Sequence, residues 1–240
     1  MLRLPALVLA AVLCAPALAG AQAPPEDHVP AEAPAPPPDP GALLARAVSL
    51  HQGGDAAGAA ALYEQVLSLG GESPVLRSNL GAAYAQLGRY DDAIGQYQRA
   101  LAADASNVAI RRNLALAYSK GGRVAEAAGE AERLLAAQPD NVPAALLLAD
   151  CRLRLGESAR VVEVLAPLAG RTSQDRAVSY VLGMALLAEG RVEEAQAAID
   201  RVLREDSAEA HVLLAAMYMK DEDCERALPE VRAALERNPA

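Results

Sequence analysis

The stretch that decides the fold runs from Ser78 to Asn107 and reads SNLGAAYAQLGRYDDAIGQYQRALAADASN. Leu80, Gly81 and Tyr84 share one face of a first helical segment, and a second helical segment follows Gly88. This spacing predicts a helix, a tight turn and a second helix packed back on the first. The arrangement recurs at a fixed period, because glycines stand 34 residues apart at Gly54, Gly88, Gly122, Gly156 and Gly190.

Small residues stand where the two helices of one unit are expected to approach each other. A large side chain at Gly81 or Ala93 would push the helix axes beyond their usual separation of about 8–10 Å. Leu80, Tyr84 and Tyr97 are predicted to fill the space between the helices. One hairpin cannot bury its apolar face alone, so the units are expected to stack into a continuous solenoid.

These residues resemble the tetratricopeptide repeat, whose units place Leu-Gly-x-x-Tyr in the first helix and Ala-x-x-x-aromatic-x-x-Ala in the second. Two positions depart from the pattern in the best-matching unit: Arg77 stands where the family often has Trp, and Ala105 where it often has Pro. The resemblance covers residues 40–240 and implies an all-α fold, a right-handed α-solenoid of about six units. The units are expected near 40–73, 74–107, 108–141, 142–175, 176–207 and 208–240.

Two units carry prolines inside their second helix. Pro167 falls late in the second helix of the fourth unit, and Pro229 falls inside that of the last unit. Each proline is expected to shorten or kink its helix. Because Val161 also occupies a normally small position, the fourth unit is predicted to be the weakest joint of the array.

The first 39 residues have a different character from the repeats. Residues 1–21 resemble a secretory signal peptide, since Arg3 is the only charge and the apolar run after it is short for a membrane span. We expect cleavage near Ala19 or Ala21 and export to the periplasm or cell envelope, without an integral membrane span. An uncleaved anchor is the alternative. The proline-rich residues 22–39 are expected to form a disordered linker.

The composition excludes several function classes. The net charge is −9, and an acidic chain with scattered basic residues is a poor nucleic-acid binder. The sequence contains no His-Glu-x-x-His, Gly-x-Ser-x-Gly, phosphate-binding glycine loop or Cys-x-x-Cys, so we expect no enzyme activity, no metal and no cofactor.

His51 and His211 are predicted to be solvated. Cys151 is predicted to be buried, and Cys224 to lie near a turn.

In the resembled family the first helices line a concave groove that binds peptides. Carried over to this sequence, the groove-lining residues are Ser78, Ala82, Gln86, Arg112, Leu116, Ser119, Lys120, Leu146, Asp150, Leu153, Arg154, Tyr180, Met184 and Leu187. The alternative is that part of this set is buried between neighbouring units. Asn79 and Asn113 occupy an asparagine position of the family's carboxylate clamp, but the basic partners of that clamp are missing.

The resulting hypothesis is a non-enzymatic scaffold or adaptor of the bacterial cell envelope that binds a protein or peptide partner in an apolar groove. The alternative is a structural subunit of a larger envelope assembly, of the secretion, pilus or cytochrome-maturation type, that contacts partners through its end faces. Leu228 and Leu235 on the last helix are expected to be partly exposed. Either this end self-associates or docks on a partner, or neighbouring charged residues shield it.

Overall fold

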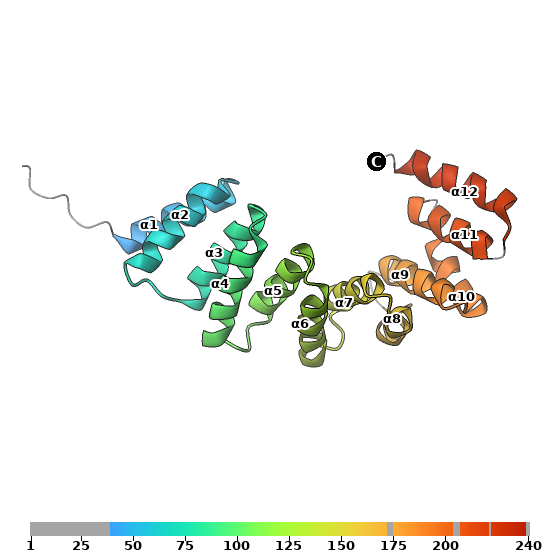
Figure 1. Cartoon of the computed structure of the whole chain (residues 1–240), viewed down its shortest axis with the longest axis horizontal. Coiled ribbons are helices and arrows are strands. Elements are labelled where there is room, and N and C mark those ends of the chain that lie inside the picture. Colours follow the sequence, from blue (N-terminus) through green and yellow to red (C-terminus); the bar gives the residue numbers. More distant parts are fainter. Residues whose placement is uncertain (1–38, 172–174, 204–206, 221, 239–240) are drawn as a thin grey trace, which may run out of the picture. The chain divides into compact units, whose positions relative to one another are not determined.

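The computed structural model describes residues 39–171, 175–203, 207–220 and 222–238. These residues form six helical pairs (Figure 1), and a 3-10 turn, η1 (Ala166–Leu168), follows the eighth helix. The first helices of the pairs are α1 (Pro40–Gln52), α3 (Pro74–Gln86), α5 (Val108–Lys120), α7 (Val142–Arg154), α9 (Asp175–Ala188) and α11 (Ala208–Lys220). The second helices are α2 (Ala56–Ser68), α4 (Tyr90–Ala103), α6 (Val124–Ala137), α8 (Ser158–Leu165), α10 (Val192–Val202) and α12 (Cys224–Arg237).

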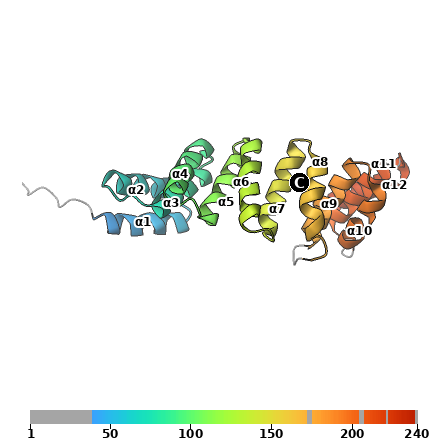
Figure 2. The ribbon, with the colours of Figure 1, turned by 90° about the horizontal axis from the view of Figure 1, so that it is seen from below.

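The helical pairs stack in chain order. Each helix packs against the next one along the chain, and first helices of neighbouring pairs also touch, from α3 with α5 to α9 with α11. Figure 2 shows the same succession from a second direction. The predicted solenoid of helix-turn-helix repeats is therefore confirmed. The predicted signal peptide and nearly all of the predicted linker lie outside the described residues.

None of the described helices combines the length and the apolar character that a membrane span requires.

The turn inside each repeat depends on one residue with a positive φ angle. Arg89 N–H donates to the carbonyl of Tyr84 at 2.9 Å, and this bond closes the helix end around Gly88 in a Schellman arrangement. In the sixth repeat Glu222 takes this place with a φ of 58°, because the fifth repeat is two residues short. The other five turns use glycines with φ between 74° and 88°, at Gly54, Gly88, Gly122, Gly156 and Gly190.

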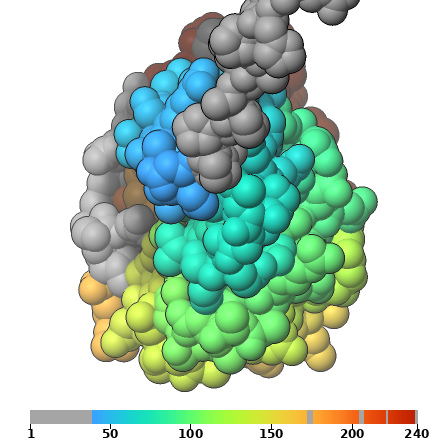
Figure 3. Space-filling model, turned by 90° about the vertical axis from the view of Figure 1, so that its left-hand side faces the viewer, coloured from blue at the N-terminus to red at the C-terminus, as the bar shows by residue number. Residues whose placement is uncertain are grey.

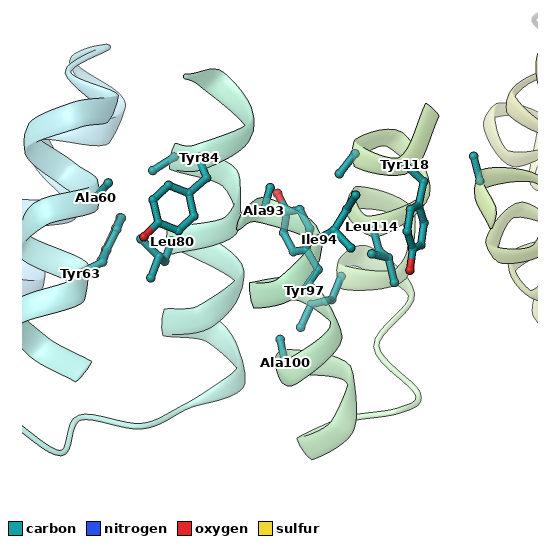
Figure 4. Packing of buried hydrophobic residues seen from close by; sticks show 14 of the residues in the cluster. Ala60, Tyr63, Leu80, Tyr84, Ala93, Ile94, Tyr97, Ala100, Leu114 and Tyr118 are labelled. Atoms are coloured by element: carbon teal, nitrogen blue, oxygen red, sulfur yellow. The ribbon is translucent and has the colours of Figure 1, made fainter. Parts of the chain in front are cut away.

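Tyrosines and small residues alternate in the core of the first three repeats. Figure 4 shows the rings of Tyr84 and Tyr97 between successive helices, with Leu80 and Ala93 beside them. A Cβ atom added at Gly81 would lie 2.9 Å from Cε1 of Tyr97, so the close helix approach predicted there is confirmed.

The buried apolar residues form two clusters that meet in the fourth repeat. The first cluster extends from Ala47 to Cys151, and the second from Val142 to Leu213. Leu135 and Val164 pack against both clusters. The two clusters thus share few side chains, at the repeat that the sequence identifies as irregular.

The two internal prolines behave differently. α8 has only eight residues, compared with 14 in α4 and α6, and Pro167 lies in η1 directly after it, so the predicted shortening is confirmed. Of the two effects predicted for Pro229, shortening does not occur, because α12 runs through this proline for 14 residues. The carbonyl that loses its donor there belongs to Glu225, which is exposed in the first turn, where water can bond it.

Candidate functional site

Two clefts open on the first-helix side of the first three repeats. The first cleft has a volume of about 340 Å³ and is lined by Val48, His51, Gln52, Tyr63, Asn79 and Gln86. The second cleft has a volume of about 220 Å³ and is lined by Ala82, Ala85, Gln86, Tyr97, Asn113, Leu116, Ala117 and Lys120. Gln86 lines both clefts, so they adjoin.

The second cleft is the first cleft moved along by one repeat. Adding 34 to Tyr63 gives Tyr97, and adding 34 to Asn79 gives Asn113. All six lining positions of the first cleft have their counterparts in the second. Each repeat boundary in this region therefore combines one buried tyrosine with one asparagine and a polar side chain at the end of the first helix.

The asparagine amides of the clefts are suited to hydrogen bonding with a ligand. Neither Asn79 nor Asn113 uses its side-chain amide to bond another residue in the described part of the chain. Burial raises the pKa of Tyr63, and it raises the pKa of Tyr97 to about 12. Both phenols therefore stay neutral at physiological pH. His51 Nδ1 lies 3.5 Å from the Tyr63 hydroxyl, which places the imidazole inside the first cleft.

The pattern changes at the next repeat boundary, between α5 and α7. The counterpart of Tyr97 is Ala131 and the counterpart of Asn113 is Leu147. Arg154 on α7 donates from Nη1 to Oγ of Ser119 on α5 at 3.0 Å. This bond joins the two first helices where the preceding boundaries leave an open cleft.

The predicted groove residues divide into three groups. Ala82, Gln86, Leu116 and Lys120 come together in the second cleft. Ser78 and Arg112 lie on the same helices without lining either cleft, and Ser119 is bonded by Arg154. On the later first helices, Asp150 and Arg154 are exposed, and the half-buried Leu146, Leu153, Tyr180 and Met184 pack against the second core cluster.

Leu187 is a correction to the predicted groove. Its side chain is only 3% exposed and belongs to the second core cluster, so it is not available to a ligand. The physical reason is that α9 packs against both α10 and α11, which covers this face of the helix.

Sequence reasoning missed Val48, His51, Gln52 and Tyr63 as cleft residues, and it treated Tyr97 only as core. The 34-residue period is the signal that finds them, since it relates each residue of one cleft to its counterpart in the other.

The histidines were predicted to be solvated, and both predictions are wrong. His51 is half-buried in the first cleft. His211 Nδ1 lies 2.5 Å from Oε2 of Glu230. The reason is again the repeat: His211 is the counterpart of Arg77 and Arg111, which bond Gln96 and Glu130 at the same place.

Charge is unevenly divided between the two sets of helices. α1, α3 and α5 contain no Asp or Glu, although the whole chain has a net charge of −9. Arg77 is paired with Glu72, and Arg111 with Glu130, whereas Arg112 and Lys120 make no ion pair with a described residue. The side of the molecule that carries the clefts thus has an excess of positive charge.

No group of three His, Cys, Asp or Glu side chains within the described ranges is arranged to hold a metal ion. Cys151 is buried, as predicted, and Cys224 is exposed at the start of α12; both are free thiols.

The stacked hairpins, the glycine turns and the repeated clefts define the class of this protein as a helical-repeat solenoid. Models of the tetratricopeptide repeat match residues 50–97 and 180–240, and a TPR repeat model matches residues 81–122. A model described as anaphase-promoting complex, cyclosome, subunit 3 matches residues 120–202. MamA from AMB-1 is 30% identical over 68% of this chain and 98% of that chain, with a TM-score of 0.54. The chain belongs to the tetratricopeptide repeat family.

Two further solved structures share the fold. YrrB, described as a TPR protein with an unusual peptide-binding site, is 21% identical over 74% of this chain and 92% of that chain, with a TM-score of 0.59. PilF of Pseudomonas aeruginosa is 16% identical over 84% of this chain and 92% of that chain, with a TM-score of 0.63. No curated protein matches the chain.

Proposed function

We propose that this protein is a non-enzymatic interaction scaffold that binds an extended peptide segment of a partner protein across the first and second clefts. The observation that carries the proposal is the repetition of asparagine and glutamine, beside a buried tyrosine, in two adjoining clefts. An extended peptide presents backbone amide groups at regular intervals, so one peptide can bond the equivalent groups of both clefts.

The dimensions of the clefts favour a peptide over a compact small molecule. Pockets for drug-sized ligands commonly reach about 300–1,000 Å³ and enclose most of the ligand. Each cleft here is at or below the lower end of that range, at about 340 and 220 Å³. A peptide in extended conformation spans both clefts while each one takes only a few side chains.

The chemistry of the lining assigns a role to each residue type. The amides of Asn79 and Asn113 donate to and accept from the peptide backbone, which provides affinity without sequence preference. Val48, Ala82 and Leu116 contact apolar side chains of the peptide. Lys120 in the second cleft and Arg112 beside it on α5 favour an acidic segment, because α1, α3 and α5 carry no acidic residue.

The cellular location is part of the proposal. The leader-like residues 1–21 support export, and we propose that the scaffold works in the periplasm or cell envelope. Mass spectrometry of the protein purified from its native envelope is expected to show a new amino terminus near Gly20 or Gln22. An intact Met1 contradicts this part of the proposal and favours the uncleaved anchor.

A selection of peptides displayed on phage, followed by fluorescence polarisation with the selected peptides, tests the groove. We expect the double variant Asn79→Ala/Asn113→Ala to bind them at least about tenfold more weakly, because two backbone contacts worth about 1 kcal/mol each are lost. The matched control is Gln65→Ala, which removes an exposed amide from α2 outside the clefts. Equal binding by the double variant and the control contradicts the groove.

The charge preference has its own test. Lys120→Glu is expected to weaken binding of acidic peptides and to remove much of its salt dependence. Arg99→Glu on α4 is the control, because it makes the same charge change on an exposed side chain that lines neither cleft. If both variants weaken binding equally, the preference reflects net charge and not the site.

The second candidate is a structural subunit that contacts its assembly through the end faces of the array. It is favoured by the exposed apolar side chains of Leu228, Val231 and Leu235 on α12. In that case the cleft variants bind the partner as the parent does, and variants of α12 do not.

A further inference from the structure

The outer surface of α12 repeats a surface that is buried elsewhere in the array. Leu228 is 53% exposed and Val231 is 38% exposed. The counterparts of Leu228 in the second, third and fourth repeats are buried against the following helix, at Ile94, Ala128 and Val162. The counterparts of Val231 are buried in all five preceding repeats, at Tyr63, Tyr97, Ala131, Leu165 and Ile199. α12 therefore presents an apolar repeat interface with no described helix on it.

The opposite end of the array is polar. Arg46 on α1 stands at the position that is a buried leucine in the next four first helices, at Leu80, Leu114, Leu148 and Leu182. Figure 3 views the molecule from the side of α1, and part of this helix (blue) faces the viewer. Ser49 likewise replaces the buried Ala83 and Ala117. The outer surface of α1 is thus suited to water.

This difference between the ends disfavours head-to-tail stacking of copies. If copies stacked head to tail, Arg46 of one copy would be pressed against Leu228 and Val231 of the next. Removing a guanidinium from water without a charged partner is costly. The apolar surface of α12 is therefore complementary to itself and not to α1.

We propose that two copies of this chain associate tail to tail, with α12 of one copy antiparallel to α12 of the other. Cys224, Leu228, Val231 and Leu235 follow one another at spacings of four, three and four residues, the seam of a two-helix coiled coil. Antiparallel pairing places Leu228 against Val231 of the second copy, and Leu235 against Cys224 of the second copy. Leu235 is the most exposed of the three aliphatic side chains, at 61%.

Charged residues beside this seam complement one another in the same pairing. Glu225 and Arg232 are both exposed, lie seven residues apart on one edge of the seam, and make no ion pair with a described residue. Antiparallel pairing brings Arg232 of each copy near Glu225 of the other, which gives two equivalent ion pairs. In a parallel pairing, Glu225 and Arg232 of the two copies lie on opposite edges of the seam, so these ion pairs do not form.

The association leaves the clefts free, because they are lined only by residues between Val48 and Lys120. One dimer therefore offers two copies of each cleft, so a partner with two acidic segments binds by avidity. The dimer itself does not depend on the peptide function.

A disulfide trap tests the pairing directly. In a Cys14→Ser background the parent keeps the buried Cys151 and the exposed Cys224. Leu235→Cys is expected to form an intermolecular disulfide with Cys224 under mild oxidation and to run as a covalent dimer on a non-reducing gel. The parent is expected to run as a monomer, since the two Cys224 residues lie at opposite ends of the seam. A covalent dimer in the parent overturns the antiparallel arrangement.

A charge swap provides the second measurement, with sedimentation velocity as the readout. The parent is expected to be dimeric, Leu228→Glu monomeric with unchanged helicity, and Arg232→Glu weaker in dimerisation by about tenfold or more. The double variant Glu225→Arg/Arg232→Glu is expected to restore the dimer, and Arg99→Glu to leave it unchanged. A parent that stays monomeric at every accessible concentration, or a double variant that does not recover, overturns the proposal.

Discussion

Glu222 adopts the left-handed backbone conformation, which residues other than glycine rarely adopt. Its φ is 58°, and the other residues with a positive φ in the described chain are all glycines, including its five counterparts in the other repeats. The left-handed conformation costs a non-glycine residue about 1–2 kcal/mol, part of which is offset by the greater freedom of glycine in the unfolded chain.

Glu222→Gly is therefore expected to raise the free energy of unfolding by about 0.5–1 kcal/mol in urea denaturation. Gly190→Ala is the inverse change at the same place in the fifth repeat, and it is expected to lower that free energy by about 1 kcal/mol. If Glu222→Gly destabilises the protein, the glutamate side chain makes a contact that outweighs the backbone strain.

Two glycines inside helices allow the effect of close packing on stability to be measured separately from the effect of helix propensity. Gly81→Ala would bring a methyl group to 2.9 Å from the buried ring of Tyr97, and we expect a loss of about 1–3 kcal/mol. A methyl group at Gly95 meets nothing within 4 Å, so Gly95→Ala is expected to gain up to about 1 kcal/mol through helix propensity alone. Thermal melting followed by circular dichroism distinguishes the two, and equal shifts would contradict the packing account.

The buried tyrosines make stability fall at alkaline pH. Burial raises the pKa of Tyr97 to about 12, whereas a tyrosine in the unfolded chain ionises near 10. Between these values the folded state holds the proton that the unfolded state has lost, so the free energy of unfolding decreases as pH rises from about 10 to 12. Tyr97→Phe is expected to flatten this decrease in urea titrations. An unchanged slope contradicts the role of Tyr97 and points to the other tyrosines of raised pKa, first among them Tyr84, whose pKa is also raised to about 12 by burial and by its hydrogen bond to Glu64.

At the scale of elements, α8 is the shortest of the described α-helices. It spans eight residues, ends at Leu165 and continues as a 3-10 turn that contains Pro167. We expect backbone amides of α8 and η1 to exchange with deuterium faster than those of α6, because short helices with few bonds open locally at low cost. Pro167→Ala is expected to slow exchange in this segment and leave α6 unchanged. Exchange in α8 as slow as in α6 would show that the burial of Val161 compensates for the short helix.

The helices were predictable because small and apolar residues recur at one period. The turn at Gly88 and the close approach at Gly81 follow from residue type alone. The continuity of α12 through Pro229 did not follow, since the sequence does not show that the freed carbonyl is solvent-exposed. The burial of Leu187 and the bond from Arg154 to Ser119 depend on how neighbouring repeats pack, so the residues that line the clefts were predicted only in part.

At the scale of the whole molecule, the division of the core into two clusters allows the two parts of the array to unfold in separate steps. Leu135 and Val164 pack against both clusters, and an array of repeats gains stability mainly from contacts between neighbours. Leu135→Ala is expected to divide denaturant unfolding into two steps. Tyrosine fluorescence reports mainly the first cluster, through Tyr63, Tyr84, Tyr97 and Tyr118, whereas circular dichroism reports both. Coincident transitions in Leu135→Ala would show that the clusters are coupled through other residues.

The arginine on the outer surface of α1 also restricts how such an array lengthens by gene duplication. A duplicated first repeat would insert a second arginine at the position where every later repeat has a leucine. The new interface between repeats would then pack poorly. A duplicated second repeat brings Leu80 with it and meets a surface already suited to receive it. New repeats are therefore expected to arise inside the array, while the present first repeat remains at its start.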